Sequence, residues 1–302
     1  MKRPGIIFLI AGALIALLAA IVFSRSGPST IRPSDNGAAA TSSQTSLPSV
    51  SPDAQTPFAT SSAPAFNLNA KAAAVGDLAT GNLLYGFNAD MRWPVASITK
   101  IMTAQIVMDL MDPEMIVTMA PSDFSAGSTS LTADLQPGDQ YRVRELLKIL
   151  LLPSSNEAAE AFARTYGRTA FMAAMNAKAA AWGLGNTHFD DPSGISVANQ
   201  STPREFVRLA RMVYALHPEI FETTRSRVAT AQEVSTGSFR QFSTTNNFAG
   251  RAGFLGGKTG TTPEAGDNLI SIFQADGGPV AVLVFGAIDR YAATESLLQL
   301  IR

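Results

Sequence analysis

The amino-acid sequence predicts an α+β fold, in which strands from the two ends of the folded part form one antiparallel sheet around an inserted helical block. Three observations predict it. Residues 72–78 and 83–87 are typical of two short strands. From residue 113 to about 218 the signals are mostly helical. Two β-branched, apolar runs then follow at 269–274 and 280–287.

The first 66 residues differ in composition from the rest. Within residues 1–25, an uncharged apolar run at 5–24 follows a positively charged start and is long enough to cross the roughly 30 Å hydrocarbon core of a membrane as a helix. We expect an uncleaved signal anchor with the remaining chain outside, in the periplasm or beyond the cell, and a cleaved signal that releases a secreted form is the alternative. Residues 26–66 are rich in Ser, Thr, Ala and Pro and predict a disordered tether. Residues 67–302 then form one folded domain.

Composition excludes several classes of function. The net charge of −1 gives no electrostatic case for a nucleic-acid partner. The absence of cysteine excludes a thiol nucleophile, a thiolate metal site and a disulfide framework. No H-E-x-x-H pattern or comparable ligand cluster indicates a metal, and we expect neither a metal nor a cofactor.

Each expected strand or helix is supported by residues within or next to it. A turn-like cluster at 79–82 joins the first two strands, and Pro94 precedes apolar residues at helical spacing over 97–111. The stretch 157–181 is rich in Ala and other helix formers.

Later elements carry equally local signals. The stretch 143–152 is strongly apolar, and 203–216 begins with a Ser/Thr cap and a first-turn proline. A glycine pair separates the two late strands, and a final helix is expected over 292–301.

The helix expected at 97–111 begins with the pattern S-x-x-K, formed by Ser97 and Lys100. Residues i and i+3 share a helix face, so the hydroxyl and the amine would meet at the buried start of the helix. An amine acts as a base only when it is neutral, and burial together with a second cation nearby would lower its pKa enough. The alternative is a surface helix with a solvated lysine, which an isolated pattern of this kind favours.

A second motif places Ser154 and Asn156 two residues apart, after an apolar helix and Pro153. The hydroxyl would relay a proton, and the amide has both a donor and an acceptor with which to hold a peptide bond. Taken alone, Ser154 is better interpreted as a helix N-cap.

The third motif, Lys258-Thr259-Gly260-Thr261, follows two glycines that let the backbone approach a ligand closely. Its lysine would attract a carboxylate, its threonines would add donors, and we expect Lys258 to be the cation that lowers the pKa of Lys100. A glycine-rich hairpin with an exposed lysine is the alternative. Ala252 excludes a P-loop.

In order and spacing, the three motifs resemble those of the D-alanyl-D-alanine carboxypeptidases, the low-molecular-mass penicillin-binding proteins, which share a fold with the serine β-lactamases. The likeness covers about residues 69–301 and extends to 80–85, 135–139, 191–194 and 261–266. It implies a DD-peptidase fold and a serine-type carboxypeptidase that removes the terminal D-Ala from peptidoglycan stem peptides. It also implies β-lactam antibiotics as covalent inhibitors, and the membrane would be contacted through the N-terminal helix.

The resemblance also implies roles for individual residues. Ser97 would be the acylated nucleophile and Lys100 its general base, while Ser154 and Asn156 would serve in proton relay and substrate-amide binding. Lys258 and Thr259 would anchor the terminal carboxylate of the substrate, and the backbone N–H groups of Ser97 and Thr261 would form the oxyanion hole. Gly260 and the carboxylate-assisting Arg290 complete the substrate-binding residues. Glu157 departs from the Asp more frequent in the family. The family's frequent second β domain is not expected either, since the sequence ends at Arg302.

Four other functions compete. An endopeptidase that cuts peptidoglycan cross-links is the nearest alternative. A class A β-lactamase would need an acid, for which Glu205 and Glu222 are available. A Ser-His-Asp hydrolase would use His188 with Asp190 or Asp191, but the chain has no G-x-S-x-G. An anchored cell-wall binding protein would keep the fold without the chemistry.

Overall fold

The computed structural model describes residues 68–124 and 134–301. The signal anchor and the tether expected at 1–25 and 26–66 lie outside these residues. Within the described ranges, no helix combines the length and the apolar character that a membrane crossing requires.

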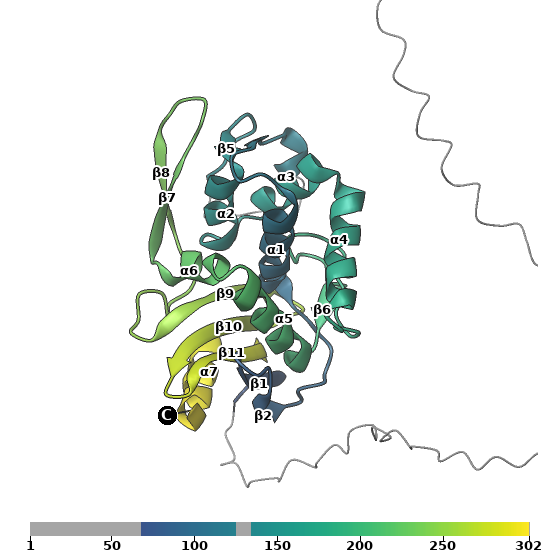
Figure 1. Ribbon diagram of the computed structural model, residues 1–302, viewed down its shortest axis with the longest axis vertical. Helices are drawn as coiled ribbons and strands as arrows, with labels where there is room; N and C mark the ends of the chain where they lie inside the picture. The colour runs from purple at the N-terminus through teal and green to yellow at the C-terminus, as the bar shows by residue number, and fades with distance from the viewer. Residues whose placement is uncertain (1–67, 125–133, 302) are drawn as a thin grey trace, which may run out of the picture. The chain divides into compact units, whose positions relative to one another are not determined.

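A five-stranded antiparallel sheet organises the described chain, as predicted (Figure 1). The first strand pairs with the last, so that Ala72 lies opposite Phe285, and the strand with the third motif forms one edge. In spatial order the strands are β2 (Leu83–Phe87), β1 (Ala72–Asp77), β11 (Gly278–Ala287), β10 (Gly266–Ala275) and β9 (Phe254–Thr262).

Among the described residues, six helices form the block inserted between the early and the late strands, and a seventh follows the last strand (Figure 1). The first of them lies at the centre of the block and is buried from Lys100 to Val107. The helices are α1 (Lys100–Leu110), α2 (Val143–Leu151), α3 (Asn156–Tyr166), α4 (Arg168–Ala181), α5 (Pro203–Leu216), α6 (Glu219–Arg225) and α7 (Arg290–Leu298).

The sheet has a core on each face because successive side chains of a strand point to opposite sides. On β1, Ala72 and Ala74 belong to the core under the helical block, while Ala73 and Val75 belong to the core under α7. This alternation explains why a strand of small apolar residues is buried on both sides.

Three details differ from the sequence prediction. The stretch expected to be one helix at 157–181 is two, because Gly167 adopts a φ of +101° between α3 and α4. The helix expected from residue 97 begins with a 3₁₀ turn, Ala96–Thr99, and α7 begins at Arg290 because Asp289 caps it.

The hairpin of β7 (Val228–Gln232) and β8 (Phe239–Ser243) has no counterpart in the prediction. The remaining short elements are β3 (Trp93–Pro94), β4 (Ile116–Thr118), β5 (Gln140–Arg142), β6 (Gln200–Ser201) and the 3₁₀ turns Pro121–Phe124 and Gln299–Ile301.

Candidate active site

A cavity of about 240 Å³ opens where the helical block meets the edge strand β9. One side is helical and comes from the start of α1 and the α2–α3 loop, and the other comes from β9 and its neighbours. Residues of all three sequence motifs meet there. The lining residues are Ser97, Ser154, Thr245, Thr259, Gly260, Thr261 and Arg290.

Ser97 lies on the 3₁₀ turn before α1 and is half-buried. The chain enters this turn through Ala96, whose φ of +49° is rare for a residue with a side chain. Lys100 follows as the first residue of α1 and is completely buried, with its Nζ 2.9 Å from the Ser97 Oγ. The solvated lysine of the alternative interpretation is therefore wrong.

The Lys100 amine makes two further contacts. Its Nζ donates to the Asn156 Oδ1 at 2.7 Å and to the backbone oxygen of Ser193 at 2.6 Å. Burial lowers the pKa of Lys100 to about 7, although the carboxylates of Asp191, Glu157 and Glu160 act in the opposite direction.

The sequence prediction named two causes for this low pKa, burial and a second cation. Burial is confirmed as the main cause, whereas the charges that act on Lys100 beside it are those of the three carboxylates and not that of Lys258. On the sheet side, burial lowers the pKa of Lys258 well below its usual value, and the charges of Lys100 and Arg290 lower it further.

Adjacent serines of the second motif occupy different environments. Ser155 caps α3 by accepting the Ala158 N–H at 3.1 Å, and it donates to the Glu157 Oε2 at 2.7 Å. Ser154 adopts a φ of +65° and accepts a hydrogen bond from the Lys258 Nζ at 2.7 Å. The N-cap interpretation of the motif thus holds for Ser155, while Ser154 lines the cavity.

On the sheet side, Lys258 is completely buried and also donates to the Thr259 backbone oxygen at 3.0 Å. The exposed hairpin lysine of the alternative interpretation is therefore excluded. The Thr259 hydroxyl lies 2.6 Å from that of Thr245.

Gly260 allows the two sides of the cavity to touch. A Cβ at this position would lie 2.9 Å from the Ser97 nitrogen and 3.0 Å from the Val95 oxygen, both backbone atoms. Any larger residue would push β9 away from the turn that carries Ser97.

Arg290 reaches back from α7 to the third motif. Its guanidinium donates to the backbone oxygens of Gly260 and Asn268 at 3.2 and 3.0 Å. It also contacts the Thr261 hydroxyl and pairs with the Asp267 carboxylate. The arginine therefore fixes the end of β9 while its own charge is partly offset.

Candidate residues of the rival functions lie outside the cavity. His188 is exposed and pairs through its backbone with Gln200, and Asp190 is exposed as well. Asp191 uses its carboxylate to accept hydrogen bonds from its own loop. Of the two acids considered for a β-lactamase, Glu205 accepts from Asn186 and Thr187, and Glu222 is exposed on α6; neither lines the cavity.

Sequence reasoning missed three contributors. Thr245 lines the cavity from the loop after β8, where no motif marks it. Ser193 contributes a backbone oxygen, which no side-chain pattern reveals. Asn199 supports the same loop through both ends of its amide, accepting from the Asp191 N–H and donating to the Asp191 oxygen. Of these contributors, only the loop of Ser193 was marked in the sequence, by the family-like stretch 191–194.

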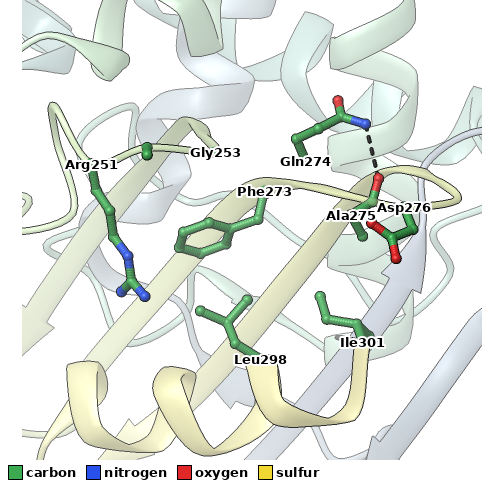
Figure 2. A pocket seen from close by; sticks show the side chains of 9 residues that line it. Arg251, Gly253, Phe273, Gln274, Ala275, Asp276, Leu298 and Ile301 are labelled. Atoms are coloured by element: carbon green, nitrogen blue, oxygen red, sulfur yellow. Dashed lines mark hydrogen bonds between the residues drawn. The ribbon is translucent and has the colours of Figure 1, made fainter.

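A second hollow of about 180 Å³ lies between the sheet and α7, away from this site (Figure 2). Phe273, Leu298 and Arg251 are among its lining residues, and Arg251 pairs with Glu295. The Gln274 Nε2 donates a hydrogen bond to the Ala275 backbone oxygen at 2.9 Å. The lining holds no serine or lysine, so we assign no acyl chemistry to it.

A lysine one helical turn after a serine, on an α+β fold of this kind, defines the class of serine acyl enzymes to which penicillin-binding proteins and serine β-lactamases belong. Within that class, the model of the D-alanyl-D-alanine carboxypeptidase family matches residues 58–289, and the chain belongs to this family. The resemblance stated from sequence is thereby confirmed, and the chain is a serine-type D-alanyl-D-alanine peptidase.

Individual relatives support the same family membership. The chain is 36% identical over 225 residues to a D-alanyl-D-alanine endopeptidase of Pseudomonas aeruginosa, covering 72% of each chain. It is 38% identical over 234 residues to a D-alanyl-D-alanine carboxypeptidase of Streptomyces sp. strain K15, covering 70% of this chain and 79% of the relative. The crystal structure of the Streptomyces K15 DD-transpeptidase matches with a TM-score of 0.69 at 34% identity, covering 77% of this chain and 95% of the other.

Proposed function

We propose that the chain is a D-Ala-D-Ala carboxypeptidase that removes the terminal D-Ala from peptidoglycan stem peptides through an acyl-enzyme on Ser97. One observation supports this most. The Ser97 hydroxyl lies 2.9 Å from a completely buried lysine amine whose pKa is near 7, and it faces a cavity that is also lined by Thr259, Gly260 and Thr261 of β9. At neutral pH a large fraction of this amine is uncharged and able to accept a proton.

In the proposed acylation, neutral Lys100 accepts the Ser97 hydroxyl proton while the Oγ forms a bond to the carbonyl carbon of the penultimate D-Ala. The backbone N–H groups of Ser97 and Thr261 stabilise the oxyanion. The amide C–N bond then breaks, and the proton that Lys100 accepted passes to the leaving amine by way of the Ser154 hydroxyl, which leaves Lys100 neutral again. Water finally cleaves the ester and releases the shortened peptide.

Substrate recognition is assigned to the other motif residues. The Asn156 amide, whose oxygen holds Lys100, has an N–H₂ group with which to bind the substrate peptide. Lys258 and the hydroxyls of Thr259 and Thr261 attract the terminal carboxylate, and Arg290 adds positive charge behind them. A β-lactam, which presents a carboxylate and a reactive amide together, would acylate the same serine.

Endopeptidase activity on cross-linked peptides is the second candidate. It is favoured by the relatives from Pseudomonas aeruginosa and Escherichia coli, which are 36% and 34% identical and are named D-alanyl-D-alanine endopeptidases. Incubation of the protein with a mixture of muropeptide monomers and cross-linked dimers separates the two activities. Free D-Ala supports the carboxypeptidase, loss of dimers supports the endopeptidase, and neither product contradicts both.

For localisation, we propose that residues 5–24 anchor the protein in the cytoplasmic membrane and that residues 26–66 are a tether for a catalytic domain at 67–302 on the outer side. An uncharged apolar run after a positively charged start supports this arrangement. The test is membrane fractionation followed by mass spectrometry of the N-terminus. A soluble protein that begins downstream of residue 25 would show instead that the segment is a cleaved signal.

A further inference from the structure

The three contacts of the Lys100 amine limit how it can act as a base. An ammonium group has three N–H donors, and Nζ has three oxygen partners, on Ser97, Asn156 and Ser193. A neutral amine has two N–H donors and one lone pair. The Asn156 Oδ1 and the Ser193 backbone oxygen accept only, so they retain the two N–H groups. The lone pair is then left facing the Ser97 hydroxyl, which becomes the donor.

The Ser193 oxygen is held in place by a compact loop. The loop is organised by the buried carboxylate of Asp191, which accepts four backbone N–H groups and one hydroxyl at 2.6 to 3.3 Å. The donors are the N–H groups of Ser193, Gly194, Ile195 and Ser196 and the hydroxyl of Ser193. A carboxylate satisfied by so many donors fixes the backbone around it.

The loop is also pressed against the nucleophile turn. A Cβ on Gly194 would lie 2.0 Å from the Ala96 backbone oxygen, so only glycine fits there. The Thr103 hydroxyl of α1 donates to the Pro192 oxygen at 2.5 Å. These contacts tie the loop to the same helix that carries Lys100.

We propose that Asp191 is a positioning residue for acyl transfer, which holds the Ser193 carbonyl where it captures one amine N–H and directs the Lys100 lone pair at Ser97. This inference rests on the proposed function, in which Lys100 is the base. Asp191 touches neither substrate nor the reacting atoms and acts through the loop. A chain with the same S-x-x-K motif but a loose loop would hold its lysine in a less reactive orientation.

Because Asp191 is charged, its substitution should change the pH dependence of acylation as well as the rate. The charged groups that face Lys100 are Glu157 and Glu160 on α3, Asp191 on the loop and Lys258 on β9. Asp191 is the strongest of the three carboxylates that favour the charged amine. Its removal therefore makes Lys100 less basic, even as the amine loses its orientation.

The experiment compares Asp191→Asn with Asp191→Glu in the full-length protein. The rate of Ser97 acylation by a fluorescent penicillin is measured from pH 5 to 9, after thermal melting has shown that each variant is folded. In Asp191→Asn we expect the plateau rate to fall about tenfold through misplacement, and the acidic limb to move roughly one pH unit lower. In Asp191→Glu the plateau falls while the limb stays, because the charge is kept and its position is lost.

Each outcome decides the proposal. A wild-type plateau in Asp191→Glu overturns the positioning role even if Asp191→Asn does not fold. An unchanged limb and plateau in Asp191→Asn overturn it as well. Failure of the wild-type protein to form an adduct on Ser97, read by mass spectrometry, contradicts the proposed function itself and is thus distinguishable from both.

Discussion

The two sides of the cavity each contain a completely buried lysine, and their surroundings differ. On the helical side, Lys100 is held by three oxygens and faced by three carboxylates, which offset part of the effect of burial on its pKa. On the sheet side, Lys258 has two oxygen partners, and the charges that act on it are those of other cations.

The contrast separates two tasks that the same residue type performs. A lysine surrounded by fixed acceptors is suited to exchange a proton with one neighbour, since its geometry does not change when its charge does. A lysine with cations behind it is under-neutralised, and an incoming carboxylate relieves the repulsion. We therefore assign chemistry to the helical side and anion recognition to the sheet side, and four substitutions test that assignment.

The largest effect is expected for Ser97→Ala. It removes the hydroxyl that is to be acylated, so covalent labelling by a fluorescent penicillin should fall below detection. The matched control is Ser155→Ala, another serine beside the site. It removes the cap of α3 at a cost of about 1 kcal/mol and should lower the melting temperature while labelling persists. Labelling that survives in Ser97→Ala would contradict the nucleophile assignment.

Replacement of Lys100 by methionine should slow acylation by about 10²- to 10⁴-fold, the usual contribution of a general base. The wild-type rate should also depend on pH. Since burial places the pKa near 7, the active neutral form increases as pH rises, and the rate should climb through pH 7 to a plateau. Stopped-flow labelling measures both effects. A rate that is flat from pH 5 to 9 would show that this amine does not control the step.

Substitution on the sheet side should be selective rather than general. Lys258→Ala should reduce kcat/KM by about 10- to 100-fold for a peptide with a free terminal carboxylate. Its amidated counterpart should lose less, because only the contact with Ser154 is then affected. Equal losses on both peptides would argue that Lys258 serves the chemistry and not the anion.

The smallest effect concerns the ion pair behind β9. Asp267 offsets the charge of Arg290, so Asp267→Asn should raise the preference for the carboxylate peptide over its amide by about two- to fivefold. Added salt should shrink the gain, because screening weakens a half-exposed charge. A preference that falls instead would mean that Asp267 matters mainly as a support for Arg290.

The features that could be predicted from the sequence are those whose signals lie in neighbouring residues. The strand pairs, the cap at Thr202 and the three motifs could be identified because turn residues, caps and spacing are written in neighbouring positions. The break at Gly167 was missed because glycine within an Ala-rich stretch is ambiguous until the tertiary structure fixes its φ. Burial was correctly named as a cause of the low pKa of Lys100, but its dominance over the charge of Lys258 could not be predicted, because the extent of burial is a property of the packed molecule. Thr245 and the Ser193 oxygen lie far from Ser97 in sequence, and only folding brings them to the site.

The absence of a side chain at Gly260, whose α-carbon carries only hydrogen atoms, sets the minimum spacing between the nucleophile turn and β9. Because backbone atoms stand on both sides of it, this dimension cannot be tuned gradually by substitution. A variant selected to discriminate between an antibiotic and a natural peptide would have to change side chains that line the cavity, such as Thr245, while the backbone spacing at Gly260 stays the same. In drug design, inhibitor shape can therefore be matched to a rigid slot.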